Sequence, residues 1–164
     1  MSDSGDFGSA AEKPLSRLSF ELTLLSRHTP ASSRHPRFQL DRSAFLILTR
    51  LDLGCPMSLR ELAEALRLDI STVNRQVGAM LDQGLVERVP DPDGGVARKV
   101  RPSDKGRELL DADRTVGRDG IGRVVAEWPA EDVEQLHRLI SRFNQSVERL
   151  EGNPWPRPGS GPHA

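Results

Sequence analysis

The sequence has little of several residue types on which particular classes of protein depend. Its 164 residues include one cysteine, no tyrosine and only 4% aromatic residues. A single cysteine excludes a disulfide framework within the chain and is typical of a cytoplasmic protein. No apolar run approaches the roughly 20 residues that span a bilayer, and the mean hydropathy is −0.49. The N-terminus has no basic start followed by an apolar stretch, so we expect no secretory signal and no membrane contact.

Motifs of catalysis and of metal binding are missing as well. The sequence contains no glycine loop that cradles phosphate, no nucleophile elbow and no zinc motif. The four histidines are scattered along the chain: His28, His35, His137 and His163. We interpret Cys55 as a structural thiol rather than a redox sensor, because no basic residue adjoins it in sequence. We therefore expect no enzyme activity, no metal and no cofactor.

Charge of one sign is not in excess either. The chain carries a net charge of −1, and its isoelectric point is about 6.4. A non-specific nucleic-acid binder has a strongly basic footprint, and this chain has none. Any affinity for DNA must therefore come from the local placement of a few basic groups, which a two-fold dimer would double.

What the sequence does contain is a helix with a clear start at residue 58. Leu59, Leu62, Ala63 and Leu66 recur at the spacing of one helix face. Ser58, followed three residues later by Glu61, matches a capping box, in which the two side chains satisfy free N–H groups at the helix start. The pattern predicts a short amphipathic helix over residues 59–66.

A second helix is predicted to follow after a tight turn at Leu68. Asp69 is a suitable N-cap, and Gly84 is free to adopt the left-handed conformation that ends helices. The apolar face is predicted to consist of Ile70, Val73, Val77, Met80 and Leu81. The polar residues near the N-terminal end are Ser71, Thr72, Asn74, Arg75 and Gln76. Such side chains suit contacts with base edges and phosphates in a DNA major groove.

Two short runs after this helix predict a β-hairpin. Residues 85–89 and 96–101 read as strands, and residues 91–95 (Asp-Pro-Asp-Gly-Gly) are turn formers. The returning strand carries Arg98, Lys99 and Arg101, which alternation sends to different faces. We expect one or two of these cations to contact DNA phosphates; the alternative is that they are ordinary solvated strand residues.

The order helix, turn, helix, strand, wing, strand resembles the MarR family of winged helix-turn-helix transcriptional regulators. The matching stretches are LDRSAFLILTRL (40–51), LRELAEAL (59–66), LDISTVNRQVGAMLDQGLVER (68–88), DPD (91–93) and VRPSDKGRELL (100–110). With the flanking helices, the resemblance covers roughly residues 14–150. It implies a DNA-binding dimer that often represses transcription until a small molecule or an oxidant releases it.

The wing departs from the family pattern. The resemblance leads us to expect Asp-Pro-x-Asp-Arg-Arg, with an arginine at the tip that reaches the minor groove. In this chain Asp93 is followed by Gly94, Gly95 and Val96. Minor-groove insertion by the wing is therefore in doubt.

The remaining segments predict the domain organisation. We expect a disordered tail (1–13), a winged-helix domain (14–151) and a flexible Pro/Gly-rich tail (152–164). Within the domain, residues 40–101 form the DNA-binding lobe, and residues 14–30 and 103–151 supply dimerisation helices. Ser103 is predicted to cap one helix and Pro129 to start the next. The first of these two helices contains Gly117, Gly120 and Gly122, which predict a bend or break within it.

The apolar periodicity of the two terminal helices has two readings. The helices either complete the core of one chain or interlock with a second copy. The second reading places four residues partly against the other chain: Leu136, Leu139, Ile140 and Phe143.

The expected fold class is mainly α with a small β-hairpin, a winged helix-turn-helix with N- and C-terminal dimerisation helices. The expected function is a homodimeric regulator, a repressor that binds a pseudo-palindromic double-stranded operator and is relieved by a small-molecule effector. A winged-helix module for protein–protein contact, without specific DNA binding, is the alternative, because the charge is balanced and the wing tip lacks arginine.

Overall fold

The computed structural model of the chain describes residues 7–28, 37–92 and 94–158. They belong to two compact units, Met1–Pro36 and Arg37–Ala164. The first unit contains one helix, α1 (Phe7–His28). This helix begins at Phe7, inside the span 1–13 that the sequence predicts to be a disordered tail. Ala10, Ala11, Glu12 and Lys13 are good helix formers and extend the helix ahead of Leu15.

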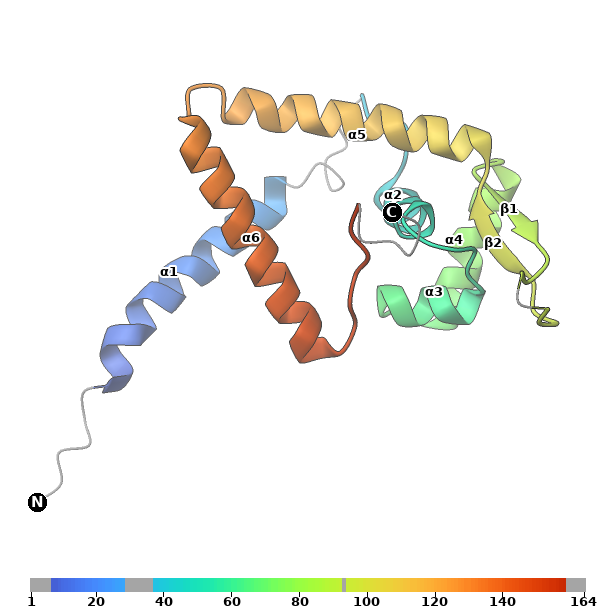
Figure 1. Cartoon of the computed structure of the whole chain (residues 1–164), viewed down its shortest axis with the longest axis horizontal. Helices are drawn as coiled ribbons and strands as arrows, with labels where there is room; N and C mark the ends of the chain where they lie inside the picture. The colour runs from blue at the N-terminus through green and yellow to red at the C-terminus, as the bar shows by residue number, and fades with distance from the viewer. Residues whose placement is uncertain (1–6, 29–36, 93, 159–164) are drawn as a thin grey trace, which may run out of the picture. The chain divides into compact units, whose positions relative to one another are not determined.

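The second unit begins with helix α2 (Arg42–Asp52), and six further elements follow it. They are α3 (Leu59–Leu66), α4 (Ile70–Asp82), β1 (Val86–Val89), β2 (Lys99–Pro102), α5 (Asp104–Val124) and α6 (Ala130–Glu151). The helices dominate and the two strands form one small sheet (Figure 1). This confirms the predicted fold class in its main point, a mainly α fold with a small β-hairpin. None of the described helices combines the length and apolar character needed to cross a bilayer.

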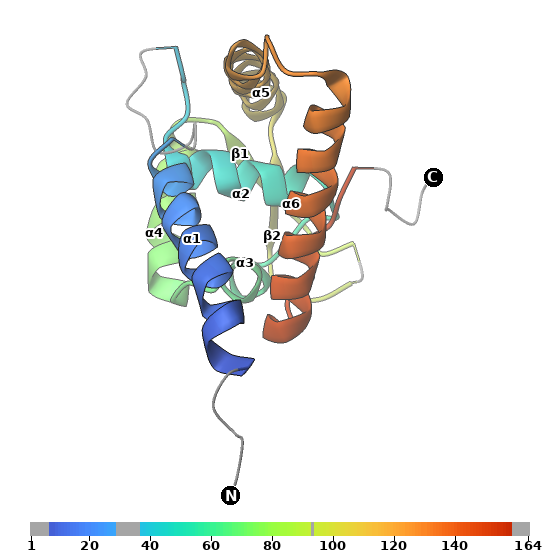
Figure 2. The same cartoon turned by 90° about the vertical axis from the view of Figure 1, so that its left-hand side faces the viewer.

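The core of the second unit is built around α2, whose inner face is fully covered. Ile47 and Leu48 have no exposed surface, and Leu51 is almost as buried. Against them pack residues from other elements of the second unit, including Leu62, Val73, Val77, Val100 and Leu110. Figure 2 shows α2 running across this lobe above α3. Each aliphatic side chain buried in this way contributes about 1.5–3 kcal/mol, and together they fix the position of the helix-turn-helix.

Side-chain hydrogen bonds cap the starts of α2 and α3. The Asp41 carboxylate accepts a hydrogen bond from Ala44 N at the start of α2. Ser58 and Glu61 form the predicted capping box at α3, which is therefore confirmed. Asp69 is the N-cap of α4, as predicted, although its side chain makes no capping hydrogen bond.

The hairpin is antiparallel and shorter than predicted. Val86 pairs with Pro102 and Val89 with Lys99, so β2 begins at Lys99 rather than at residue 96. Residues 96 and 97 are bends. A further bridge joins Val100 to Met57, which ties β2 to the segment before α3. The returning strand is therefore held at its base, and the wing loop is wider than the turn formers suggested.

Helix α5 runs without a break from Asp104 to Val124, although it contains Gly117, Gly120 and Gly122. The predicted bend or break is wrong, because glycines cost only about 1 kcal/mol each relative to alanine and do not remove backbone hydrogen bonds. The chain turns sharply only after Val125. Pro129 is the N-cap of α6, as predicted. Figure 1 shows this corner between α5 and α6.

A short C-terminal segment folds back onto the helix-turn-helix. Gly152 ends α6 with a φ of 65°, in the left-handed region. The next five residues, Asn153–Arg157, contact α2, α3 and α6 through Trp155, Asn153 and Arg157. We call them the C-terminal strap. The predicted flexible tail is therefore wrong for residues 153–157, and residues 159–164 lie outside the described part of the chain.

Candidate nucleic-acid interface

The turn between α3 and α4 is short and backbone-specified. Arg67, the C-cap of α3, has a φ of 54° and lies in the left-handed region. Leu68 N donates to Ala63 O at 3.0 Å, which closes the turn as predicted. Asp69 then leads directly into α4. The N-terminal turn of α4 is therefore held at a fixed angle to α3.

Helix α4 has one buried face and one open face. Val73, Val77 and Met80 are buried, as predicted. Ile70, which was predicted to join them, is 52% exposed because it lies at the first position of the helix, outside the packed turns. The exposed residues of the first two turns include Ser71, Asn74 and Arg75, and Thr72 is half-buried beside them.

These polar groups are available for a ligand. Within the described ranges 7–28, 37–92 and 94–158, no hydrogen bond or ion pair engages the side chains of Asn74 or Arg75. An amide and a guanidinium without internal partners can donate to base edges, and a guanidinium can bond a guanine edge twice. The structure thus brings Ser71, Asn74 and Arg75 together on an open helix face.

Gln76 does not belong to this exposed group. Its Nε2 donates to the Ser43 hydroxyl of α2 at 3.0 Å. Its Oε1 is buried and has no partner among the described residues. The side chain is therefore directed into the α2–α4 contact. Sequence reasoning missed Ser43, because its pairing with Gln76 spans 33 positions and no local pattern signals it.

In the wing, Lys99 is held by carboxylates. Its Nζ lies 3.1 Å from Asp91 Oδ1 and 3.8 Å from Glu61 Oε1, and its side chain is only 12% exposed. The backbone hydrogen bond from Ser58 and the charge of Lys99 lower the pKa of Glu61, although burial opposes them. Lys99 therefore joins the wing base to the start of α3 instead of facing solvent.

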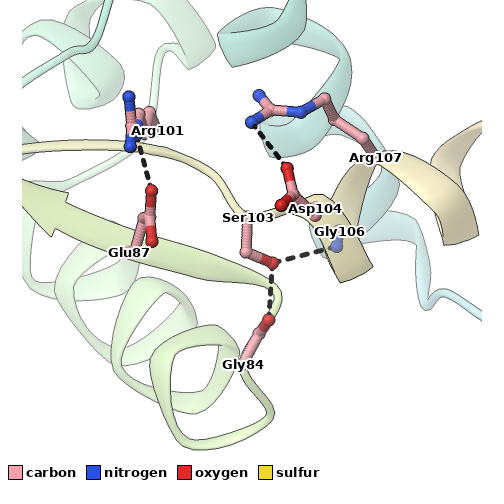
Figure 3. Close-up of polar contacts among 7 residues, drawn as sticks. All are labelled: Gly84, Glu87, Arg101, Ser103, Asp104, Gly106 and Arg107. Atoms are coloured by element: carbon pink, nitrogen blue, oxygen red, sulfur yellow. Dashed lines mark hydrogen bonds and ion pairs between the residues drawn. The ribbon is translucent and has the colours of Figure 1, made fainter.

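The other two predicted cations of the wing differ from each other. Arg101 Nε lies 2.6 Å from Glu87 Oε1 across the hairpin, and both side chains are about half exposed (Figure 3). Arg98 is exposed. Among the residues that the structure describes, no carboxylate lies within ion-pair distance of Arg98. Of the three cations predicted to contact DNA from the returning strand, Arg98 therefore has the least internal competition for a phosphate.

The base of the hairpin is joined to α5 by one hydroxyl. Ser103 Oγ donates to Gly84 O at 2.6 Å and accepts from Gly106 N at 3.0 Å (Figure 3). Gly84 has a φ of 69° and ends α4, as the sequence predicted. One side chain thus links the C-terminal end of α4, the end of β2 and the start of α5. This confirms Ser103 as a cap and explains how α5 is positioned against α4.

The remaining candidate groups form no metal site in the described part of the chain. Cys55, which we predicted to be a structural thiol, is exposed and is not part of the buried core. His137 is exposed and its Nδ1 lies 3.8 Å from Glu134. No group of three His, Cys, Asp or Glu residues suited to a metal occurs among the described residues. The side chains of His28, His35 and His163 lie outside them.

Sequence comparison relates the chain to bacterial regulators. A sequence model of the MarR family matches residues 40–95. The uncharacterized HTH-type transcriptional regulator YxaD of Bacillus subtilis is 31% identical over 137 residues, which cover 82% of this chain and 96% of the relative. A second regulator of the same organism, YybA, is 24% identical over 110 residues, covering 67% of this chain and 73% of YybA.

Solved structures share the fold. MarR from E. coli in its apo form superposes with a TM-score of 0.62 at 21% identity, over 79% of this chain and 96% of MarR. A cysteine-to-serine variant of E. coli MarR in complex with operator DNA gives a TM-score of 0.58 at 21% identity, over 79% of this chain and 93% of the variant. The MarR family transcription regulator SP03579 gives a TM-score of 0.69 at 16% identity, over 89% of this chain and 97% of SP03579.

Proposed function

Because this chain belongs to the MarR family of transcriptional regulators, we propose that it is a homodimeric repressor that binds a specific operator in the cytoplasm. Its family and its relatives are regulators rather than enzymes. The observation that carries the proposal is the open face of α4, where Ser71, Asn74 and Arg75 follow a tight turn. The MarR variant of similar fold was solved with operator DNA, which supports the same use of this fold here.

In the proposed complex, the N-terminal half of α4 enters the major groove. Arg75 bonds a guanine edge, and Asn74 pairs with an adenine. Ser71 and Thr72 contact phosphates or bases near the N-terminus of the helix, where the helix dipole favours negative charge. Gln76 supports α4 from behind through Ser43 instead of reading a base.

The wing plays a supporting part in this proposal. A Gly94-Gly95 tip has no side chain that could enter a minor groove. Lys99 and Arg101 already pair with Asp91 and Glu87. Arg98 is left as the main phosphate contact, and the wing adds salt-sensitive attraction with little sequence preference.

The apolar face of α6 supports a dimer. This helix has no buried residue within the chain. Leu139 and Phe143 are 48% and 43% exposed, and Leu136 and Ile140 are similar. Leucines of α1 are exposed as well, with Leu15 at 64%. An exposed apolar face such as that of α6 marks an interaction surface, and a second copy is the partner that a family of dimers implies.

Two such copies would present two α4 helices to one side of the duplex. Half-sites would then lie about one helical turn apart, or about 10–10.5 base pairs, in a pseudo-palindrome. We further propose that a small-molecule effector relieves repression by favouring a dimer whose helices no longer match this spacing, a shift of population between two states. Membership of the family is the support for this step.

A titration of the protein against its own upstream DNA tests the proposal. We expect specific binding that weakens with salt, and a loss of about 1–3 kcal/mol per half-site in Arg75→Ala. Arg123→Ala, which removes an exposed arginine at the end of α5, is the matched control and should bind normally. Equal, weak binding to operator and unrelated DNA by the intact protein would instead favour a protein–protein module.

A further inference from the structure

The C-terminal strap contacts the helix-turn-helix at the end of α3. After α6, the chain reverses at Gly152 and passes alongside α3 and α2 (Figure 1). Asn153 N donates to Glu148 O at 3.1 Å, which stabilises the reversal. The strap therefore starts from a defined geometry rather than from a frayed helix end.

Asn153 caps α3 from a distant part of the sequence. Its Nδ2 donates to Ala65 O at 3.0 Å and lies 3.5 Å from Glu64 O. The last four carbonyls of a helix have no partner within the helix, so an external donor is valuable there. The donor comes from 88 positions away, which makes the end of α3 depend on the position of the strap.

Arg67 makes a second connection at the same place. This residue is the left-handed C-cap of α3 and belongs to the turn before α4. Its guanidinium lies 2.9 Å from Glu151 Oε1 and donates to Glu151 O at 3.1 Å. Glu151 is the last residue of α6. The turn of the helix-turn-helix is thus joined directly to the end of α6.

The far end of the strap is anchored on both sides. Arg157 donates to both carboxylate oxygens of Glu148, at 2.7 and 2.9 Å, and to Trp155 O at 2.9 Å. The Trp155 ring lies 5.9 Å from the guanidinium carbon of Arg50 on α2, within the range of a cation–π contact. The paired hydrogen bonds between the Arg157 guanidinium and the Glu148 carboxylate also fix a specific geometry. The strap is thereby held against α6 and α2 as well as α3.

We propose that the C-terminal strap positions the helix-turn-helix relative to α6 and so sets the separation of the two α4 helices in the dimer. The inference rests on the proposed function, because α6 carries the expected dimer face. Asn153, Arg67 and Trp155 are positioning residues in this account. They act through α3 and the turn, and they read no base.

A strap that only added stability would have different consequences. Its loss would lower the unfolding temperature and leave the folded dimer able to select its operator. A positioning strap, in contrast, is needed for specific binding by molecules that are already folded and dimeric. Binding to unrelated DNA, which depends on phosphate charge rather than on helix spacing, should then change little.

Two truncations of the full chain form a matched pair. Ending the chain after Gly152 removes the strap, whereas ending it after Pro158 keeps the strap and removes only residues 159–164. The longer form should bind the operator like the intact protein. The shorter form should remain a folded dimer but bind the operator at least about tenfold more weakly, equivalent to about 1.4 kcal/mol. Unchanged specific affinity in the shorter form would overturn the proposal.

The sole cysteine allows the geometry to be measured directly. Cys55 is exposed and lies between α2 and α3, so a nitroxide there reports on the lobe without further substitution. Pulsed electron–electron double resonance measures the distance between the two nitroxides of the dimer. The distance distribution should be narrow in the longer form and broader or displaced in the shorter form. Identical distributions in both forms would contradict a positioning role.

A single-atom change covers the case in which truncation prevents folding. Asn153→Asp keeps the shape of the side chain and replaces the donor to Ala65 O by an acceptor. It should broaden the Cys55 distances and weaken operator binding, and Asn153→Gln, which keeps an amide donor, should restore part of both. Failure of the intact protein to dimerise or to select an operator would instead show that the proposed function itself is wrong.

Discussion

Lys99 and Asp91 form an ion pair at the base of the wing, with Nζ 3.1 Å from Oδ1. Both side chains are mostly covered, at 12% and 13% exposure. A lysine in this setting stabilises the hairpin and is not available to a phosphate. The ion pair stabilises the base of the wing. It also distinguishes Lys99, which has a structural role, from the exposed Arg98.

The wing cations are therefore expected to respond differently to substitution. Arg98→Ala should lower the salt slope of log K by about 0.9 for each phosphate of B-DNA that the arginine neutralises. Lys99→Met should leave this slope unchanged and lower the unfolding temperature, because Asp91 and Glu61 lose their partner. Binding isotherms over a range of salt concentrations, with thermal unfolding of each variant, provide the comparison. A reduced slope in Lys99→Met would return Lys99 to the DNA interface.

The two neighbours Arg75 and Gln76 should likewise separate. Arg75→Ala should reduce discrimination among operator variants. Gln76→Ala should leave the ranking of the variants unchanged and should destabilise the fold modestly, because it removes the hydrogen bond to Ser43. Affinities measured over a panel of operators with single base-pair changes would test this. A ranking altered by Gln76→Ala would show that the glutamine leaves the α2–α4 contact and reads a base.

Gly106 lies where no side chain fits. A Cβ at this position would be 2.0 Å from Leu85 O and 3.2 Å from Leu48 Cδ2. Gly106→Ala should therefore force α5 away from the end of α4 and destabilise the protein strongly. Gly117→Ala, on the same helix with open space around it, should stabilise the helix by up to about 1 kcal/mol. Chemical unfolding of both variants measures the change in the free energy of unfolding, which should fall in Gly106→Ala and rise in Gly117→Ala. An unchanged free energy of unfolding in Gly106→Ala would contradict the packing described.

The attachment of the strap should depend on pH. The hydrogen bonds from Arg157 hold the pKa of Glu148 below its usual value of 4.5. A lowered carboxyl pKa contributes stability that is fully present above 4.5 and is lost as the pH falls through the lowered pKa. Trp155 fluorescence in a Trp128→Phe background should change in that acid range. In Glu148→Gln the acid transition should be absent, and its persistence would assign the transition to another group.

The sequence predicted those features that depend on neighbouring residues. The Ser58–Glu61 capping box, the Ser103 cap, the left-handed Gly84 and the start of α6 at Pro129 each follow from short-range backbone chemistry. The apolar spacing of residues 59–66 and 73–80 predicted the buried faces for the same reason. The order of elements then followed from these local signals.

Features that depend on distant partners could not be predicted in this way. Asp113 is 1% exposed and accepts hydrogen bonds from Gln39 N and Leu40 N, more than 70 positions away. Gln76 was predicted to contact DNA from its place in the sequence, whereas its side chain donates a hydrogen bond to Ser43, 33 positions away. The composition of residues 152–158 suggested a flexible tail, because proline and glycine counts carry no information about what Asn153 or Trp155 contacts.

Two copies of the chain are expected to bind one specific operator together. Sedimentation velocity of the intact protein with a labelled duplex from its own upstream DNA tests this expectation. We predict that the free protein sediments at twice 18.1 kDa, and that two chains bind each duplex but not a scrambled duplex of equal length and composition. A monomer on the duplex, or equal binding to both duplexes, would contradict the account.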